Sequence, residues 1–294
     1  MNRFTATLIL IVATAIWGFA FIAQKSAMDS MQPLTFIAMR YILGGLVIAP
    51  LAWREYKRRN IKISYKEWAI IAFLSINFFL GSWLQQWGLV STSVTNGGFL
   101  TGMYVFFVPL ILLFVFRTKP HKIVWVCMPL ALTGLFLLTG GKLDKINSGD
   151  WLIISSAVFW AMHVLGLGYA ARLTKMPLVV SCLPFLFAGI ISGAGAFMFE
   201  TPTITGISGG WIEILYAGIL STAVAFTLQA VGQMHVPPAN AAIILSGESL
   251  FAAIGGAVIL GERLLAIGYI GAALIFLTII LVESVPAIIR RKEN

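Results

Sequence analysis

The chain has 294 residues, of which 59% are hydrophobic and 11% are charged, and its mean hydropathy is +0.93. Because so few polar side chains cannot cover a globule of this size, the composition excludes a water-soluble domain and predicts a membrane protein. The formal net charge of +9 does not indicate nucleic-acid binding, since the basic residues flank apolar segments, as topology signals do.

The N-terminal segment MNRFTATLILIVATA has the basic start, the apolar stretch and the A-x-A sequence of a signal peptide. The apolar run nevertheless continues through Trp17 to Ile22, a total of about 20 residues, which is enough to span a bilayer. We therefore predict that this segment remains in the protein as its first transmembrane helix.

Apolar segments of similar length follow along the rest of the chain, and no soluble domain interrupts them. The two cysteines, Cys127 and Cys182, lie inside such segments, so we expect buried thiols and no disulfide framework. The fold class is an all-α integral membrane protein. We predict ten transmembrane helices, at about 5–24, 33–53, 68–89, 94–116, 122–139, 150–170, 177–198, 211–232, 237–260 and 264–287.

Basic residues concentrate on one side of these predicted helices. If the N-terminus is cytoplasmic, most of the 20 Lys and Arg residues lie inside, including the six in the loop REYKRRNIKISYK. Only Lys25, Lys142, Lys145 and Arg263 then lie outside, and Arg40 lies within a helix. The positive-inside rule thus predicts cytoplasmic N- and C-termini in the inner (plasma) membrane, with anionic lipid headgroups as neighbours of the basic loops.

The sequence repeats itself at a shift of 143 or 144 residues. AIWGF at 15–19 resembles VFWAM at 158–162, and PLTFIAMRYILGGLV from Pro33 resembles PLVVSCLPFLFAGII from Pro177. Five helices are therefore followed by five equivalent helices, which we assign to repeats 1–142 and 148–290. Because five is odd, the two repeats must be inverted in the membrane, as in many secondary transporters, whose substrate site lies at the repeat interface near mid-bilayer.

Two tryptophans depart from the usual position at the membrane surface. Trp17 and Trp160 lie near the midplane at equivalent repeat positions, where an indole N–H needs a partner or a wet cavity. We predict that both rings face a central cavity and offer π surface to an apolar or cationic group. Packing of the Trp17 indole against Gly18 or another small residue is the alternative.

Charged residues deep in the membrane are costly and therefore indicate function. Glu248 is the only deep carboxylate, and we predict that it binds a cation or carries a proton, with a structural role between helices as the alternative. Arg40 has three options: a substrate carboxylate, a carbonyl at a helix end, or Glu248 itself. If Arg40 and Glu248 pair, exchange of partners would gate the cavity.

Uncharged polar residues add further candidates for the substrate site. His163 lies one turn after Trp160 and is either a proton relay or a hydrogen-bonded packing residue. Asn77 and Tyr104, which is the repeat counterpart of Glu248, offer hydrogen bonds to a polar group of a small substrate, as do Gln85 and Gln229. Each of them alone is more often part of an interhelical hydrogen bond.

Four stretches of the chain also resemble a known family: AIWGFAFIAQK, FIAMRYILGG, LQQWGLVSTSVTNGGFLTGMYVFFVPL and LQAVGQMHVPPANAAIILSGESLFAAIGGAVILGE. They are similar to the EamA-type members of the drug/metabolite transporter superfamily, which have two tandem repeats. The resemblance implies ten helices, cytoplasmic termini, and a central cavity lined mainly by helices one to four and six to nine, with five and ten peripheral. Where the family often has a proline after the glutamate of the ninth helix, this chain has Ser249.

We predict a secondary transporter that moves a small amphiphilic metabolite by alternating access around this cavity. The resemblance implies export and an amino-acid-like or amine-like substrate. Because the sequence has no nucleotide site, we expect an ion or exchange gradient to supply the energy, with Glu248 and His163 as the candidate proton carriers. A facilitative uptake permease or an exchanger is the alternative within the same class. A membrane lipid-modifying enzyme is the alternative from a different class. Such an enzyme needs a cluster of acidic, basic or metal-binding residues near the lipid headgroups, and no loop of the sequence carries one. We therefore expect that the protein is not an enzyme and has no cofactor or metal site.

Overall fold

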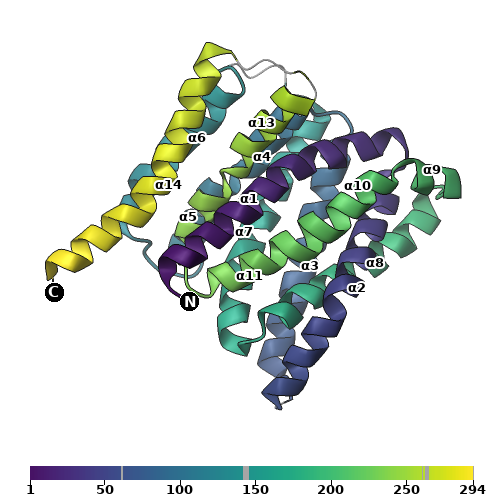
Figure 1. The fold of residues 1–294 in the computed structure, drawn as a ribbon, viewed down its shortest axis with the longest axis horizontal. Helices are drawn as coiled ribbons and strands as arrows, with labels where there is room; N and C mark the ends of the chain where they lie inside the picture. Colours follow the sequence, from purple (N-terminus) through teal and green to yellow (C-terminus); the bar gives the residue numbers. More distant parts are fainter. Residues whose placement is uncertain (61, 142–145, 260, 262–264, 294) are drawn as a thin grey trace.

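The computed structural model describes the chain except for residues 61, 142–145, 260, 262–264 and 294, and except for the side chains of 287 and 289–293. The basic residues Lys142, Lys145 and Arg263 of the predicted outer loops thus lie outside the described residues. The described part is a bundle of helices with no strand, and both ends of the chain lie on the same side of the bundle (Figure 1). The protein is an all-α, multi-pass membrane protein, as predicted.

The helices agree with the ten predicted segments. Nine stretches of the described chain are long and apolar enough to span a membrane, and α6 is a shorter apolar helix of 17 residues. The main elements are α1 (Arg3–Ser26), α2 (Pro33–Arg59), α3 (Tyr65–Gly88), α4 (Val94–Gly102), α5 (Tyr104–Phe114), α6 (Lys122–Leu138), α7 (Ser148–Thr174), α8 (Pro177–Phe199), α10 (Trp211–Leu215), η2 (Tyr216–Phe226), α11 (Thr227–Gln233), α12 (Pro238–Leu245), α13 (Glu248–Ile259) and α14 (Ala266–Glu293). Two short elements, η1 (Ala27–Asp29) and α9 (Ile204–Gly209), lie in loops.

The contacts between helices are similar in the two halves of the chain, so that a contact made by one helix has a counterpart made by its repeat-related helix. α2 packs on its counterpart α8, and α6 packs on its counterpart α14 at the edge of the bundle (Figure 1). α1 packs on α13, and correspondingly α7 packs on α4 and α5. The peripheral position of α6 and α14 agrees with what the family resemblance implies for helices five and ten.

Carboxylates fix the two ends of the α2–α8 pair. Glu200, which follows α8, accepts hydrogen bonds from the backbone N–H groups of Leu34 and Thr35 in the first turn of α2, at 2.7 and 2.8 Å. Glu55, near the end of α2, accepts one from the N–H of Val179 in the first turn of α8, at 2.9 Å. Because the first N–H groups of a helix have no partner within the helix, each helix is capped by a carboxylate from near the end of the other.

Three of the membrane helices are irregular where the sequence predicts continuous ones. The fourth is broken at Met103, between α4 and α5, and the ninth at Ser246 and Gly247, between α12 and α13. Bonds from the Met103 N–H to the Leu100 carbonyl and from the Ser249 N–H to the Ser246 carbonyl tighten the chain into 3₁₀-type turns there. The two breaks fall at equivalent places in the repeats.

The eighth membrane helix contains a π-helical segment, η2. Within it, the Thr222 hydroxyl donates a 2.7 Å hydrogen bond to the carbonyl of Ala217, five residues earlier. A π-helical turn is wider than an α-helical one and often occurs at functional sites. This segment faces α1 and α2, and it contributes two residues to the pocket described next.

Candidate functional site

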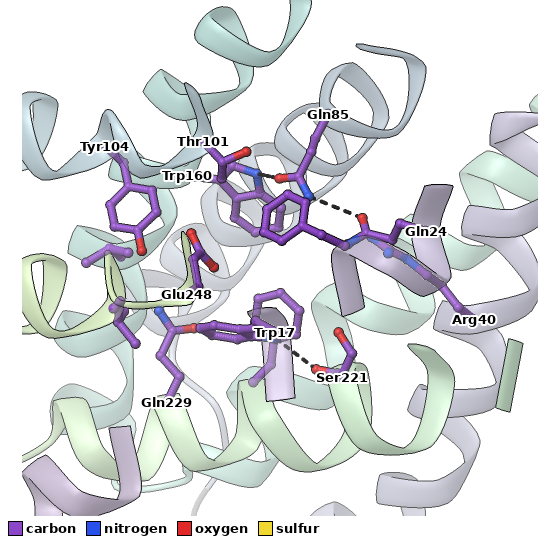
Figure 2. Close-up of a pocket in the computed structure, with 14 residues that line it drawn as sticks. Trp17, Gln24, Arg40, Gln85, Thr101, Tyr104, Trp160, Ser221, Gln229 and Glu248 are labelled. Carbon is purple, nitrogen blue, oxygen red and sulfur yellow. Dashed lines mark hydrogen bonds between the residues drawn. The ribbon is translucent and has the colours of Figure 1, made fainter. Parts of the chain in front are cut away.

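A pocket lies between the two halves of the bundle (Figure 2). Its free space is about 50 Å³, which is room for a few water molecules, so the pocket must widen before it can hold a metabolite. It is lined by Trp17, Phe21, Gln24, Arg40, Gln85, Thr101, Tyr104, Trp160, Val164, Ser221, Phe226, Gln229, Leu245 and Glu248.

Most of these residues are pairs related by the repeat. At the shift of 143 or 144 residues, five pairs line the pocket from both halves: Trp17 with Trp160, Phe21 with Val164, Gln85 with Gln229, Thr101 with Leu245, and Tyr104 with Glu248. Residues that are equivalent in inverted repeats meet where the two halves face each other. The pocket therefore lies at the repeat interface, the place where secondary transporters with inverted repeats bind their substrates.

Glu248 lies at the broken part of the ninth membrane helix. It is the first residue of α13 and is only 5% exposed. Its Oε1 atom is buried and has no hydrogen-bond partner among the described residues, and Tyr104, the first residue of α5, lies on the same side of the pocket (Figure 2). No cationic side chain of the described chain lies within salt-bridge distance of this carboxyl.

Arg40 is the second charged residue of the pocket, and it is 3% exposed. Its guanidinium donates a hydrogen bond to the Tyr41 hydroxyl, and its carbon lies 4.4 Å from the Tyr41 ring centre and 5.4 Å from that of Phe36. Its Nε has no partner. The predicted ion pair with Glu248 is not formed in this structure, in which Figure 2 shows the two residues on opposite sides of the pocket.

The mid-depth position of Trp17 has two structural reasons. Its indole N–H donates a 3.1 Å hydrogen bond to the carbonyl of Ser221 in η2, and its ring lies 4.5 Å from that of Phe226, between ring centres. The neighbouring Gly18 packs against α13, where an added Cβ would lie 2.7 Å from the carbonyl oxygen of Glu248. Trp17 therefore faces the pocket, while Gly18 supplies the close helix contact.

Trp160 belongs to a chain of polar groups. Its indole N–H donates a 2.7 Å hydrogen bond to Gln85, whose amide N–H donates a 3.2 Å bond to the side chain of Gln24 (Figure 2). Gln24 and Gln85 lie near the C-terminal ends of α1 and α3. The two hydrogen bonds link α1, α3 and α7 in the wall of the pocket, so these helices cannot separate there unless the bonds break.

Two of the predicted substrate residues do not line the pocket in this structure. His163 is 2% exposed and packs among rings, 5.2 Å from Phe78 and 5.7 Å from Trp160 between centres. Neither of its nitrogens has a hydrogen-bond partner among the described residues. The Asn77 amide donates to the carbonyl of Phe73 one turn earlier in its own helix, at 2.8 Å. Neither residue is therefore among those that line the pocket.

Several lining residues carried no signal in the sequence. Four of them are ordinary apolar residues of apolar helices: Phe21, Val164, Phe226 and Leu245. Phe21 and Val164 each follow one of the two repeat-related tryptophans by one helical turn, so this spacing could have predicted them. Ser249, which stands in place of the family's proline, donates a 2.6 Å hydrogen bond to the carbonyl of Gly98 and thus joins α13 to α4.

Comparison with known families assigns this fold. Residues 4–140 and 147–284 each match the EamA-like transporter family. The chain belongs to this family. The two matches cover nearly the whole described chain, one for each half of the helix bundle, and the resemblance seen in the sequence is thereby confirmed.

Relatives from distant organisms are similar over nearly their whole length. An uncharacterized transporter of Archaeoglobus fulgidus is 30% identical over 96% of this chain and 87% of its own. The uncharacterized transporter YwfM of Bacillus subtilis is 24% identical over 95% and 94%, and the uncharacterized inner membrane transporter YedA of Escherichia coli K12 is 24% identical over 91% and 87%. A crystal structure at 17% identity covers 100% of both chains with a TM-score of 0.79, which shows that the fold is shared.

Proposed function

We propose that this EamA-family protein is a secondary transporter that exports a small amphiphilic metabolite, such as an amino acid or an amine, across the inner membrane. The observation that carries the proposal is the pocket that both repeats line with equivalent residues, and in which no cationic side chain of the described residues lies within salt-bridge distance of the buried Glu248 carboxyl. Export and the substrate class rest on the family resemblance, and the orientation with cytoplasmic termini rests on the distribution of basic residues.

Alternating access follows from the architecture. Because the halves are inverted and meet at the pocket, rocking one half against the other would open the site to either side in turn. In the proposed cycle, the hydrogen bonds from Trp160 to Gln85 and from Gln85 to Gln24 would break when the helices that carry them separate. They join neutral groups at 2.7 and 3.2 Å, and such bonds each contribute about 1 kcal/mol, so they are weak enough to break and re-form in a transport cycle.

Proton coupling is the second part of the proposal, with Glu248 as the proton carrier. A buried carboxylate without a counter-ion is unfavourable in a membrane, so its charge must be balanced either by a proton or by a cationic group of the substrate. A site that accepts one of them at a time exchanges a proton for the substrate. His163 is a weaker candidate, because it does not line the pocket.

Transport and proton movement in liposomes test this proposal. We would reconstitute wild type, Glu248→Gln and Glu213→Gln and measure substrate flux and internal pH on addition of amino acids and amines. Glu213 lies near the start of α10 outside the pocket, and its variant keeps a carbonyl oxygen that can accept the 3.0 Å hydrogen bond from Ser26. We expect coupled flux in wild type and Glu213→Gln but not in Glu248→Gln.

Two other results would change the proposal. Substrate flux without proton movement, unchanged in Glu248→Gln, would make the protein a facilitator or an exchanger and leave Glu248 a structural residue. Absence of flux for every amino acid and amine tested would refute the substrate class.

A further inference from the structure

We propose that Arg40 is the carboxylate-binding residue of the central pocket, so that the substrate is a small carboxylate with an apolar body and simple amines are rejected. This inference rests on the proposed function, since it takes the pocket to be the substrate site. It goes further by choosing between the two substrate classes and by assigning a specific side chain to the choice.

The first step is the charge of Arg40. The side chain is 3% exposed, and no carboxylate of the described residues lies within salt-bridge distance of it. A guanidinium does not lose its proton in proteins, unlike a carboxyl group, which can become neutral by gaining one. The described residues thus supply no anion to balance the charge of Arg40, and the carboxylate of a substrate can supply one, whereas a proton can neutralise Glu248.

The second step is the geometry of the guanidinium. Among the described residues its hydrogen bond goes to the Tyr41 hydroxyl, a neutral group, and its Nε has no partner. Tyr41 is held in turn by Ser82, with 2.5 Å between the hydroxyl oxygens, and the rings of Tyr41 and Phe36 lie against the guanidinium. Arg40 is thus positioned by its neighbours, while most of its five N–H donors stay free for the two oxygens of a carboxylate.

The third step is the surface between the two charged residues. Figure 2 shows Arg40 and Gln24 on one side of the pocket and Glu248 and Tyr104 on the other, with Trp160 between them. Aromatic rings in this position favour an apolar body next to the carboxylate. The pocket thus combines an anion-binding group, an apolar wall and, on the far side, a carboxyl.

Two matched ligand series test the inference without any mutation. We would titrate purified wild type with L-phenylalanine, 3-phenylpropionate and phenethylamine, and with L-leucine, 4-methylpentanoate and isopentylamine, and follow binding by calorimetry. Loss of a charge-assisted bidentate contact weakens binding by about 10- to 100-fold. We therefore expect a carboxylate in at least one series to bind at least about tenfold more tightly than its amine. Equal or tighter binding of the amines, or no binding of any carboxylate, would overturn the inference.

Variants then assign the preference to Arg40. Arg40→Gln should lose the preference for carboxylates, whereas Arg40→Lys, which keeps the charge but not the planar fork, should retain it in weakened form. The matched control is Arg54→Gln, which removes an exposed arginine of the same helix outside the pocket and should behave as wild type. An unchanged preference in Arg40→Gln would overturn the assignment, and if this variant does not fold, the wild-type series and Arg40→Lys decide.

The inference and the proposed function can fail separately. Carboxylate binding to the purified protein that depends on Arg40, without flux of the same compound in liposomes, would keep the binding site and refute transport. Flux of amines that does not change in Arg40→Gln would keep transport and refute the carboxylate site.

Discussion

Replacing Gly18 by alanine should separate α1 from α13 and disturb the pocket that we propose as the substrate site. A Cβ at this position would lie 2.3 Å from the Cβ of Phe251 and 2.7 Å from both the backbone nitrogen of Ala252 and the carbonyl oxygen of Glu248. Ordinary contacts of a Cβ are 3.4–4 Å, so the helices must move apart by about 1 Å, because backbone atoms cannot turn aside as side chains do. The displaced segment begins with Glu248 itself.

The size of the effect follows from two opposing terms. Overpacking of this kind costs about 1–3 kcal/mol, whereas an alanine stabilises a helix by about 1 kcal/mol relative to glycine. A control with the second term alone is available in Gly193→Ala on α8, where the new Cβ would lie 3.7 Å from the Cβ of Ala38, an ordinary contact. The difference between the two variants therefore isolates the clash, about 1–3 kcal/mol, or roughly 2–10 °C in melting temperature.

Thermal unfolding in detergent, followed by tryptophan fluorescence, measures this difference, and liposome flux measures the effect on the pocket. We expect Gly18→Ala to melt below Gly193→Ala and to transport poorly, while Gly193→Ala transports as wild type does. Equal melting temperatures for the two variants, with transport intact in both, would refute the reasoning that Gly18 sets the distance between α1 and Glu248.

Two more predictions concern tryptophan and cysteine. Trp17→Phe removes the indole N–H that donates to the Ser221 carbonyl and should lower the free energy of unfolding by about 1 kcal/mol. Trp83→Phe should lower it less, because the Trp83 indole N–H has no hydrogen-bond partner among the described residues. Equal melting temperatures of the two variants would contradict this prediction. Cys127 and Cys182 are buried and free, so a maleimide should label neither in the folded protein and both after unfolding without reductant, and fewer than two labels would reveal a disulfide.

Hydropathy and the repeat were sufficient to predict the ten helices, because a bilayer requires a fixed length of apolar helix whatever the packing. The same signals do not predict where a helix departs from regular geometry. The break at Met103 and the one at Ser246 and Gly247 lie in apolar runs, and their tight turns depend on packing between helices. The sequence also gives no sign of the π-helical segment η2, because its pattern of residues is that of an ordinary amphipathic or buried α-helix.

The sequence predicted those residues of the candidate site that are rare inside a membrane, and it missed those that are common there. Glu248, Arg40 and the two midplane tryptophans stand out because polar groups at that depth are rare, and all four line the pocket. His163 stands out for the same reason but lies among aromatic rings, because depth alone does not tell which face of a helix a residue occupies. Which face points inward depends on neighbouring helices that the sequence does not place.

The chemistry of the pocket lies in the places where the repeats differ. Trp17 with Trp160 and Gln85 with Gln229 preserve the same side chain in both halves. Identical residues in the two halves suit the proposed opening of the pocket to each side of the membrane in turn. Glu248, by contrast, stands opposite Tyr104. Arg40 likewise has no polar counterpart, since the shift of 144 residues leads to proline 184. In the proposed alternating access, the symmetric residues form a frame that opens to either side, and the asymmetric residues hold the substrate in one orientation. Substitutions that exchange Glu248 and Tyr104 should therefore alter substrate choice and leave the fold intact.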